Sequence, residues 1–177
     1  MRLFIGIKLP AKIRAYLYEV ERLFPKQGLK FVNEGDIHLT IKFLGETEDI
    51  NSINAALSKV SFKPFNARLY GLGVFPNERF IRVIHSPVTI GKEELLALHY
   101  SIDSALNKIG FLKDKNFTPH ATIARVKSSS PEIIKIVNSI KFAQEFIVDS
   151  FTLFSSNLTS GGPIYSVVKE FSAEVDK

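Results

Sequence analysis

Two short segments of the chain repeat one pattern, a histidine, an apolar residue and a threonine. His38 and Thr40 form the first pair, and His120 and Thr122 form the second, about half the chain length further on. On a β-strand, residues i and i+2 point to the same face, so each pair presents an imidazole beside a hydroxyl. The apolar residues between and after them face the other way. The pattern predicts two strands, each with one polar face.

These four side chains suit a phosphate group that reacts by in-line attack. One neutral histidine can take a proton from the attacking water, while a protonated one gives a proton to the departing oxygen. The threonine hydroxyls can donate to the non-bridging oxygens. A single His-x-Thr is usually structural, but here two of four histidines carry it in a chain with only seven threonines, a coincidence of roughly 1%. We therefore expect the two pairs to share one site without a metal.

The other two histidines lack the pattern. His85 ends a predicted strand before a serine and a proline, and His99 lies beside the apolar stripe of a predicted helix, so both are interpreted as structural. A zinc site needs a third ligand at a recognisable spacing, such as His-x-His, and none occurs. The absence of cysteine excludes disulfides, thiolate nucleophiles and cysteine-ligated metal centres. Zinc is kept as a minor alternative, and no cofactor is expected.

The composition is that of an ordinary globular protein, with 45% hydrophobic residues among 177 and a mean hydropathy near zero. We expect one domain over residues 1–177, built as two lobes that share a core. Every apolar run is too short to span a membrane, so a cytoplasmic protein is predicted. The net charge of +5 mildly favours an anionic partner such as nucleic acid.

Helices and strands alternate along the chain. Apolar residues at helical spacing predict four helices, at 13–24, 50–60, 95–109 (before a capping Gly110) and 133–140. Strand-like stretches cover 3–9, 37–44, 65–74, 80–84, 118–126, 146–154 and 164–171. Turn signals at 76–77 and 160–163 favour antiparallel pairing. These elements predict an α+β fold with two curved sheets and helices outside. Because helix, loop and His-x-Thr strand recur in both halves, we expect pseudo-two-fold lobes around a central cleft.

The motif segments and three shorter stretches match a known family in order and spacing. They are residues 2–7 (RLFIGI), 38–46 (HLTIKFLGE), 73–76 (GVFP) leading to 82–84 (RVI), 119–126 (PHATIARV) and 158–165. On these residues the chain resembles the 2H phosphoesterases, in particular the RNA 2',3'-cyclic phosphodiesterases first described as 2'-5' RNA ligases. The resemblance covers nearly the whole chain.

The resemblance implies a bilobal α+β fold, no metal or nucleotide cofactor, and opening of an RNA 2',3'-cyclic phosphate to a 2'-phosphate. It implies that His38 protonates the leaving 3' oxygen and His120 activates water, although these two roles could be reversed. Thr40 and Thr122 would hold the phosphate. The partner would be an RNA with a 2',3'-cyclic phosphate end, such as a tRNA fragment. Neither a membrane nor an obligate protein partner is implied, and a monomer is expected.

Two further residues match family positions that contact the phosphate or the terminal base. Phe43 and Arg125 each lie five residues past a motif histidine. An odd offset puts them on the opposite face of an ideal strand, so they reach the cleft only if the strand ends, twists or bulges before them. Core packing is the alternative for Phe43, whereas an arginine would be costly to bury. Arg82 also matches but could belong to a solvated edge, and His85 replaces a tryptophan common in relatives.

Three functions stay open from the sequence. The first is hydrolysis of the cyclic phosphate, with joining of RNA ends through a 2'-5' bond as the reverse reaction. The second is a non-catalytic module that binds RNA ends or nucleotides. The third is a phosphodiesterase for a smaller substrate, such as a cyclic nucleotide, ADP-ribose cyclic phosphate or a 2'-5' oligonucleotide.

Overall fold

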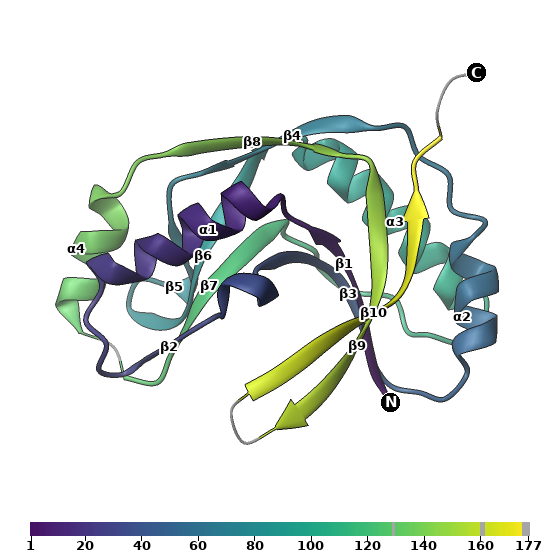
Figure 1. Ribbon diagram of the computed structural model, residues 1–177, viewed down its shortest axis with the longest axis horizontal. Coiled ribbons are helices and arrows are strands. Elements are labelled where there is room, and N and C mark those ends of the chain that lie inside the picture. Colours follow the sequence, from purple (N-terminus) through teal and green to yellow (C-terminus); the bar gives the residue numbers. More distant parts are fainter. Residues whose placement is uncertain (129, 160–161, 175–177) are drawn as a thin grey trace.

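The computed structural model describes residues 1–128, 130–159 and 162–174. Within these residues, ten strands and four α-helices alternate along the chain (Figure 1). The strands are β1 (Arg2–Lys8), β2 (Leu29–Phe31), β3 (His38–Glu46), β4 (Phe65–Tyr70), β5 (Gly73–Asn77), β6 (Phe80–Ile90), β7 (His120–Val126), β8 (Ala143–Val148), β9 (Ser150–Thr159) and β10 (Gly162–Ser172). The helices are α1 (Ala11–Glu19), α2 (Ile50–Leu57), α3 (Lys92–Asn107) and α4 (Pro131–Ser139), with short 3-10 turns η1 (Val20–Leu23) and η2 (Glu34–Asp36).

The four predicted helices form, and each ends earlier than its apolar pattern indicated. α1 gives way to η1 at Val20, and α3 ends at Asn107 rather than at residue 109. Gly110 still closes the turn beyond α3, because its N–H donates to the Asn107 carbonyl at 3.1 Å. α2 begins after Asp49, whose carboxylate accepts from the Ser52 N–H at 3.0 Å and caps the helix.

The seven predicted strands become ten for two reasons. The stretches 65–74 and 146–154 each contain two strands, and β2 had no strong signal because it has only three residues. All pairings within the described residues are antiparallel. The predicted hairpin turn at 160–163 lies partly outside the described residues, which omit 160 and 161.

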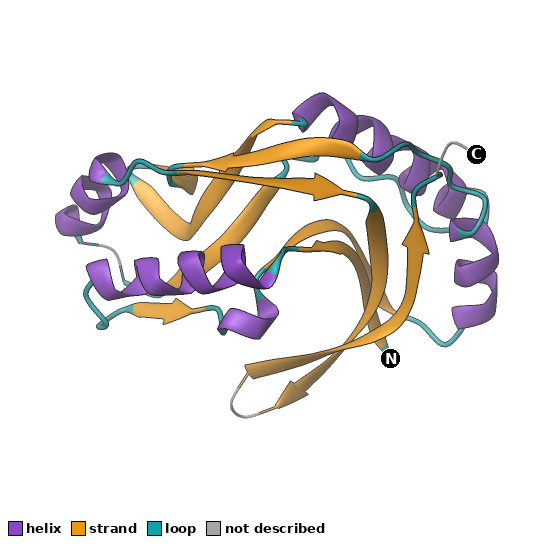
Figure 2. Cartoon of the chain, turned by 45° about the horizontal axis from the view of Figure 1, so that its top comes forward, coloured by secondary structure: helices purple, strands orange, loops and turns teal. Residues whose placement is uncertain are grey.

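The two curved sheets that we expected are joined in one hydrogen-bonded path. Its order is β10-β9-β1-β3-β7-β6-β4-β8, with β2 added beside β7 and β5 beside β6. Figure 2 shows these strands in orange. The two halves meet at a narrow seam, because β3 and β7 pair only through Leu39 and Ala121. On each side of the seam four strands follow, so the expected two lobes appear as two arms of one sheet.

Three of the four α-helices lie toward the two ends of the molecule, and α1 runs from the α4 side toward the middle (Figure 1). α2 and α3 pack together at one end and α4 lies at the other (Figure 1). Behind the motif strands, Leu39, Ile41, Ala121 and Ile123 are at most 2% exposed and belong to one apolar core. The predicted alternation of the motif strands is therefore confirmed. No helix of the described residues is long and apolar enough to cross a membrane.

Candidate active site

The seam brings the two predicted motifs onto adjacent strands. Continued by one residue on each side of the Leu39–Ala121 pair, the antiparallel register sets His38 opposite Thr122 and Thr40 opposite His120. All four motif side chains are partly exposed, whereas the residues between them are buried. Two histidines and two threonines from distant parts of the chain thus share one face of the sheet.

Each motif histidine is held by the same local hydrogen bond. His38 Nδ1 lies 2.6 Å from the Asp36 carbonyl oxygen, and His120 Nδ1 lies 2.7 Å from the Thr118 carbonyl oxygen. A carbonyl can only accept, so in both rings Nδ1 carries the hydrogen and donates. The lone pair of the neutral ring is then on Nε2. His38 Nε2 lies 2.9 Å from the Thr40 hydroxyl oxygen. Both rings are therefore fixed with Nε2 available for proton transfer.

The pKa values of both histidines lie below the ordinary 6.5. Burial is the main cause for His38, opposed by the Asp36 hydrogen bond and charge, while charge on His120 lowers its pKa further. Burial also lowers the pKa of His120, opposed by its bond to Thr118. Because the two rings repel each other when charged, they titrate as a pair. An anion bound beside them would favour a proton on one of them.

A β-bulge carries Phe43 to the same face as His38. In the pairing with β1, Gly6 faces Thr40 but Ile5 faces Lys42, so Ile41 is an extra residue in β3. The alternation of side chains reverses there, and Phe43 is 68% exposed. Its ring centroid lies 6.0 Å from that of Phe4, which lies 4.9 Å from the ring of His38.

A second β-bulge, in β7, carries Arg125 to the face of the second motif. In the pairing with β6, His85 faces Thr122 and Ile84 faces Ala124, so Ile123 is the extra residue in β7. Arg125 then lies opposite Val83, on the same face as Thr122, and it is exposed. Its charge acts on Tyr165 of β10, in the other arm of the sheet. Phe43 and Arg125, each five residues after a motif histidine, therefore reach the face of the motif side chains because of an extra residue three positions after each histidine.

Aromatic side chains that the sequence did not single out surround His38. Phe154 and Tyr165 lie 6.0 and 5.4 Å from its ring, in addition to Phe4. Gly6 lies directly behind, and a Cβ there would come within 3.2 Å of His38 Cδ2 and 2.8 Å of the Leu39 carbonyl oxygen. A hollow of about 170 Å³ adjoins His38. It is lined by Lys8, Arg14, Gly35, Asp36, Ile37, His38, Phe154, Tyr165 and Val167.

His85, interpreted from the sequence as structural, is buried directly beside the second motif histidine. Its ring stacks on Phe75 at 3.9 Å and lies 5.2 Å from the ring of His120. Burial and the charge of His120 lower the pKa of His85 to about 4. The contact arises because His85 faces Thr122 across the strand pair, which sequence spacing alone does not reveal. Arg82, by contrast, lies over the exposed Phe80 ring at 4.3 Å.

One group of the described residues has the geometry of a metal site, but the ammonium group of a lysine lies between its carboxylates. His99, Asp103 and Asp114 offer ligand atoms within 4.8 Å of one another. Lys42 Nζ lies 2.7 Å from Asp103 Oδ1 and 2.9 Å from Asp114 Oδ1. The ammonium takes the place of a cation between the two carboxylates. His99 is thus part of a buried ion-pair network, in addition to its predicted position on the helix.

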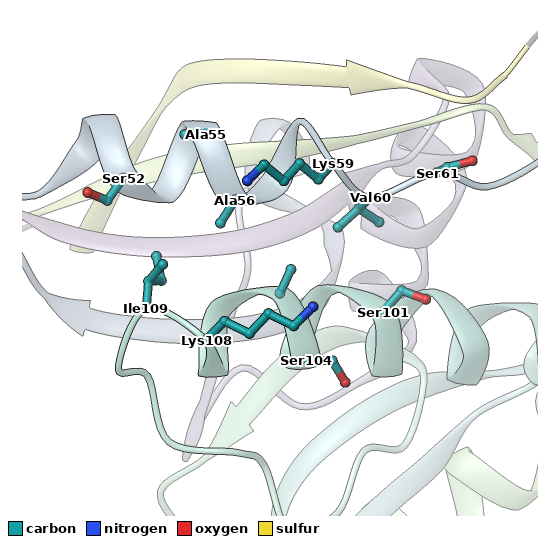
Figure 3. A pocket seen from close by; sticks show the side chains of 11 residues that line it. Ser52, Ala55, Ala56, Lys59, Val60, Ser61, Ser101, Ser104, Lys108 and Ile109 are labelled. Carbon is teal, nitrogen blue, oxygen red and sulfur yellow. The ribbon is translucent and has the colours of Figure 1, made fainter.

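A larger hollow, of about 570 Å³, lies away from the motifs between α2 and α3 (Figure 3). Small side chains and two lysines line it, among them Ser52, Lys59, Ser101 and Lys108. None of the predicted site residues lines this hollow. The predicted site residues lie at the seam instead.

Comparison with known proteins gives consistent matches over the whole chain. The family described as the 2'-5' RNA ligase superfamily matches residues 9–159. Two relatives named RNA 2',3'-cyclic phosphodiesterase are 33% identical, from Methanocaldococcus jannaschii, and 37% identical, from Archaeoglobus fulgidus. Each alignment covers 97% of this chain and 100% or 99% of the relative.

Solved structures agree with these matches. A Thermus thermophilus protein, TT0787, is 34% identical with a TM-score of 0.84, and Escherichia coli LigT complexed with 3'-AMP is 25% identical with the same TM-score. Both alignments cover 97% of each chain. The α+β architecture is therefore shared along the full length.

Proposed function

Since the chain belongs to the 2'-5' RNA ligase superfamily, we propose that it opens the 2',3'-cyclic phosphate at an RNA end to a 2'-phosphate. The observation that carries the proposal is the pair of imidazoles on one face of the seam, each with Nδ1 tied to a carbonyl. A pair of that kind can supply a base and an acid to one phosphate. The relatives named RNA 2',3'-cyclic phosphodiesterase support an RNA cyclic phosphate as the substrate class.

In the proposed reaction, His120 is the base and His38 is the acid. His120 Nε2 takes a proton from a water molecule whose oxygen attacks phosphorus. The bond from phosphorus to the 3' oxygen breaks as protonated His38 Nε2 delivers its proton to that oxygen. The product has a 3'-hydroxyl and a 2'-phosphate, and the two histidines have exchanged protonation states. The negative charge of the substrate opposes the lowering of the His38 pKa by burial, so binding favours the required proton.

The phosphate and the terminal nucleotide would be held by the remaining residues of this face. Thr40 and Thr122 donate to non-bridging oxygens, and Arg125 supplies a positive charge as negative charge develops. The exposed ring of Phe43 suits stacking with the terminal base. Every step uses side chains of this chain, and we propose that no metal is needed.

The reverse reaction would use the same groups. A 5'-hydroxyl in place of water, attacking the cyclic phosphate, would give a 2'-5' bond between two RNA ends. We propose that residues 1–177 act as one domain for both directions, because the two motifs meet only when both arms of the sheet are present. A monomer suffices, since both histidines come from one chain.

The test is to incubate the purified protein with an oligonucleotide that ends in a 2',3'-cyclic phosphate. The product's phosphate position is read by ³¹P NMR, with and without EDTA. We expect a 2'-phosphate at an unchanged rate in EDTA. His38→Ala and His120→Ala should each lower kcat by about 100- to 10,000-fold, since each removes one proton-transfer group. A 3'-phosphate product, or binding without turnover, would contradict the proposal, and the second result would favour a binding module.

The size of the substrate is tested by salt. An RNA contacted at several phosphates should lose affinity steeply as salt is raised, whereas a cyclic mononucleotide should not. Equal salt dependence for an oligonucleotide and for 2',3'-cyclic AMP would indicate that the small molecule is the substrate.

A further inference from the structure

The buried Lys42 on β3 is fully engaged in a network behind the first motif. Its side chain is 2% exposed, and its three N–H donors match three acceptors. These are Asp103 Oδ1 at 2.7 Å, Asp114 Oδ1 at 2.9 Å and the Leu112 carbonyl oxygen at 2.9 Å. Burial would lower the pKa of Lys42, but the bonds to the two carboxylates outweigh it and raise the pKa. The lysine is therefore charged and held in one place.

The bulge in β3 is what sends this lysine inward. Lys42 has an even offset from His38 and would face the cleft on a regular strand, but the extra residue at Ile41 turns it toward α3. The corresponding residue after the bulge in β7 is the fully buried Ala124. The two motifs have matching backbones, yet only the first places a charge beneath the sheet.

The partners of Lys42 belong to the segment that leads into the second motif. Residues 108–119 connect α3 to β7 and contain neither helix nor strand. The Leu112 carbonyl is bound by Lys42, and the Asp114 N–H donates to Asp103 Oδ1 at 3.3 Å. Asp114 Oδ2 lies 3.0 Å from His99 Nε2. Side chains, rather than regular main-chain pairing, thus anchor this segment.

The end of the segment determines how His120 is oriented. The His99 ring stacks on Phe117 at 4.3 Å with the planes 11° apart. The next residue is Thr118, whose carbonyl accepts from His120 Nδ1 at 2.7 Å. A chain of contacts therefore runs from Lys42 through Asp114 and its neighbours to the acceptor that fixes the tautomer of His120.

The acceptor of the first histidine needs no such support. The Asp36 carbonyl belongs to the turn η2, which is closed by its own bonds. The Asp36 N–H donates to the Asn33 carbonyl at 2.9 Å, and the Ile37 N–H donates to the Glu34 carbonyl at 3.3 Å. The acceptor of His120 instead follows a long irregular segment, and this difference explains why the network lies on one side only.

We propose that Lys42 and Asp114 are positioning residues that hold the 112–118 segment, so that the Thr118 carbonyl keeps His120 Nε2 directed at the substrate. The proposal rests on the proposed function for its kinetic consequence, but its geometric part is independent of turnover. A buried ion pair contributes little net stability compared with apolar packing, so a role in positioning gives the network a physical reason.

The test uses Asp114→Ala, which removes the side-chain bonds of Asp114 to Lys42 and His99 and leaves the bond of Lys42 to the Leu112 carbonyl. The side chain of Asp114 is 34% exposed, so the protein should still fold. We expect kcat to fall by about 10- to 100-fold with KM within about threefold, because small displacements of a reacting group cost this much. Asp114→Asn keeps an oxygen for Lys42 and should recover most of kcat. Should Asp114→Ala not fold, His99→Phe replaces it, because the stack on Phe117 is kept while the bond to Asp114 is lost.

The matched control is Asp49→Ala at the start of α2. It removes a carboxylate that also ties down a loop end, by accepting from the Ser52 N–H at 3.0 Å, but in a helix cap outside the network. It should lower stability and leave kcat unchanged. The second measurement is the ¹⁵N shifts of the His120 ring at a pH where the ring is neutral. The wild type should show hydrogen on Nδ1, and Asp114→Ala a mixture of tautomers.

Unchanged His120 shifts in a folded Asp114→Ala protein would overturn the proposal, whether or not kcat falls. A wild type that does not hydrolyse cyclic phosphate would refute the proposed function instead. In that case the ¹⁵N comparison would still decide whether the network orients His120.

Discussion

Replacement of His85 by phenylalanine should reduce the protein's sensitivity to acid. His85 is 5% exposed, its Nδ1 has no hydrogen-bond partner among the described residues, and its ring stacks on Phe75. Burial, and then the charge of His120, lower its pKa from 6.5 to about 4. A phenylalanine can stack on Phe75 in the same way but has no proton to gain.

The sign follows from where the proton binds. Between pH 6.5 and 4 the unfolded chain protonates this histidine, whereas the folded chain does not, so acid favours unfolding. The stability that the folded chain gains from a neutral His85 is fully present above pH 6.5. It is lost as the pH falls toward 4. A lowering of this size corresponds to about 3 kcal/mol in full, of which about 2 kcal/mol is lost between pH 7 and pH 4.5.

The assay is urea unfolding followed by circular dichroism at pH 7 and pH 4.5. The free energy of unfolding of the wild type should fall between these two values by about 2 kcal/mol more than that of His85→Phe. The larger ring will press on Gly73, because a Cβ there would already lie 3.0 Å from His85 Cε1. That contact lowers stability at both pH values and cancels in the difference. Equal acid losses in the two proteins would refute the assignment of a lowered pKa to His85.

Four further results are expected. Because the pKa values of His38 and His120 are both lowered, kcat/KM should follow a bell-shaped pH profile with its maximum below pH 6.5, and a maximum above pH 7 in rate measurements would contradict this. Asp36→Asn removes a charge that raises the pKa of His38, so the alkaline limb of kcat/KM should move to lower pH; a shift to higher pH would exclude His38 as the acid. Arg125→Ala should lower kcat/KM about 10- to 100-fold with unfolding in urea nearly unchanged, since the side chain is exposed, and wild-type kinetics would exclude a phosphate contact. Phe43→Ala should change stability by less than about 0.5 kcal/mol yet raise KM for an oligonucleotide several-fold, which steady-state kinetics can check against 2',3'-cyclic phosphate substrates of increasing length.

The motifs and their faces could be predicted from the sequence because strand periodicity is a local property. His38, Thr40 and the buried Leu39 follow the two-residue repeat, and the second motif does the same. The bulges could not be placed, since an extra residue shows only against the partner strand. In β3 it appears where Ile5 faces Lys42 after Gly6 has faced Thr40.

Contacts across strands account for the other omissions. His85 lies beside His120 because of the register of β6 against β7. The two histidines are far apart in the sequence, so their spacing does not indicate this contact. Lys42 would be a solvent-facing residue on a regular strand, but its 2% exposed side chain is paired with α3. The joining of the two sheets follows from one residue pair at the seam, which no spacing rule indicates.

The two motifs share nearly the same local backbone, so any difference in their roles must come from their surroundings. Both histidines donate Nδ1 to the carbonyl two residues before them, and both strands bulge three residues after them, so the backbone gives neither a distinct role. The difference comes from the neighbouring charges. Asp36 raises the pKa of His38, which favours a proton there, whereas no carboxylate acts in this way on the pKa of His120 within the described residues. The charge of His120 acts in the opposite direction and lowers the pKa of His38. The Asp36 charge therefore favours His38 as the acid, the His120 charge opposes it, and the pH profile of Asp36→Asn distinguishes the two assignments.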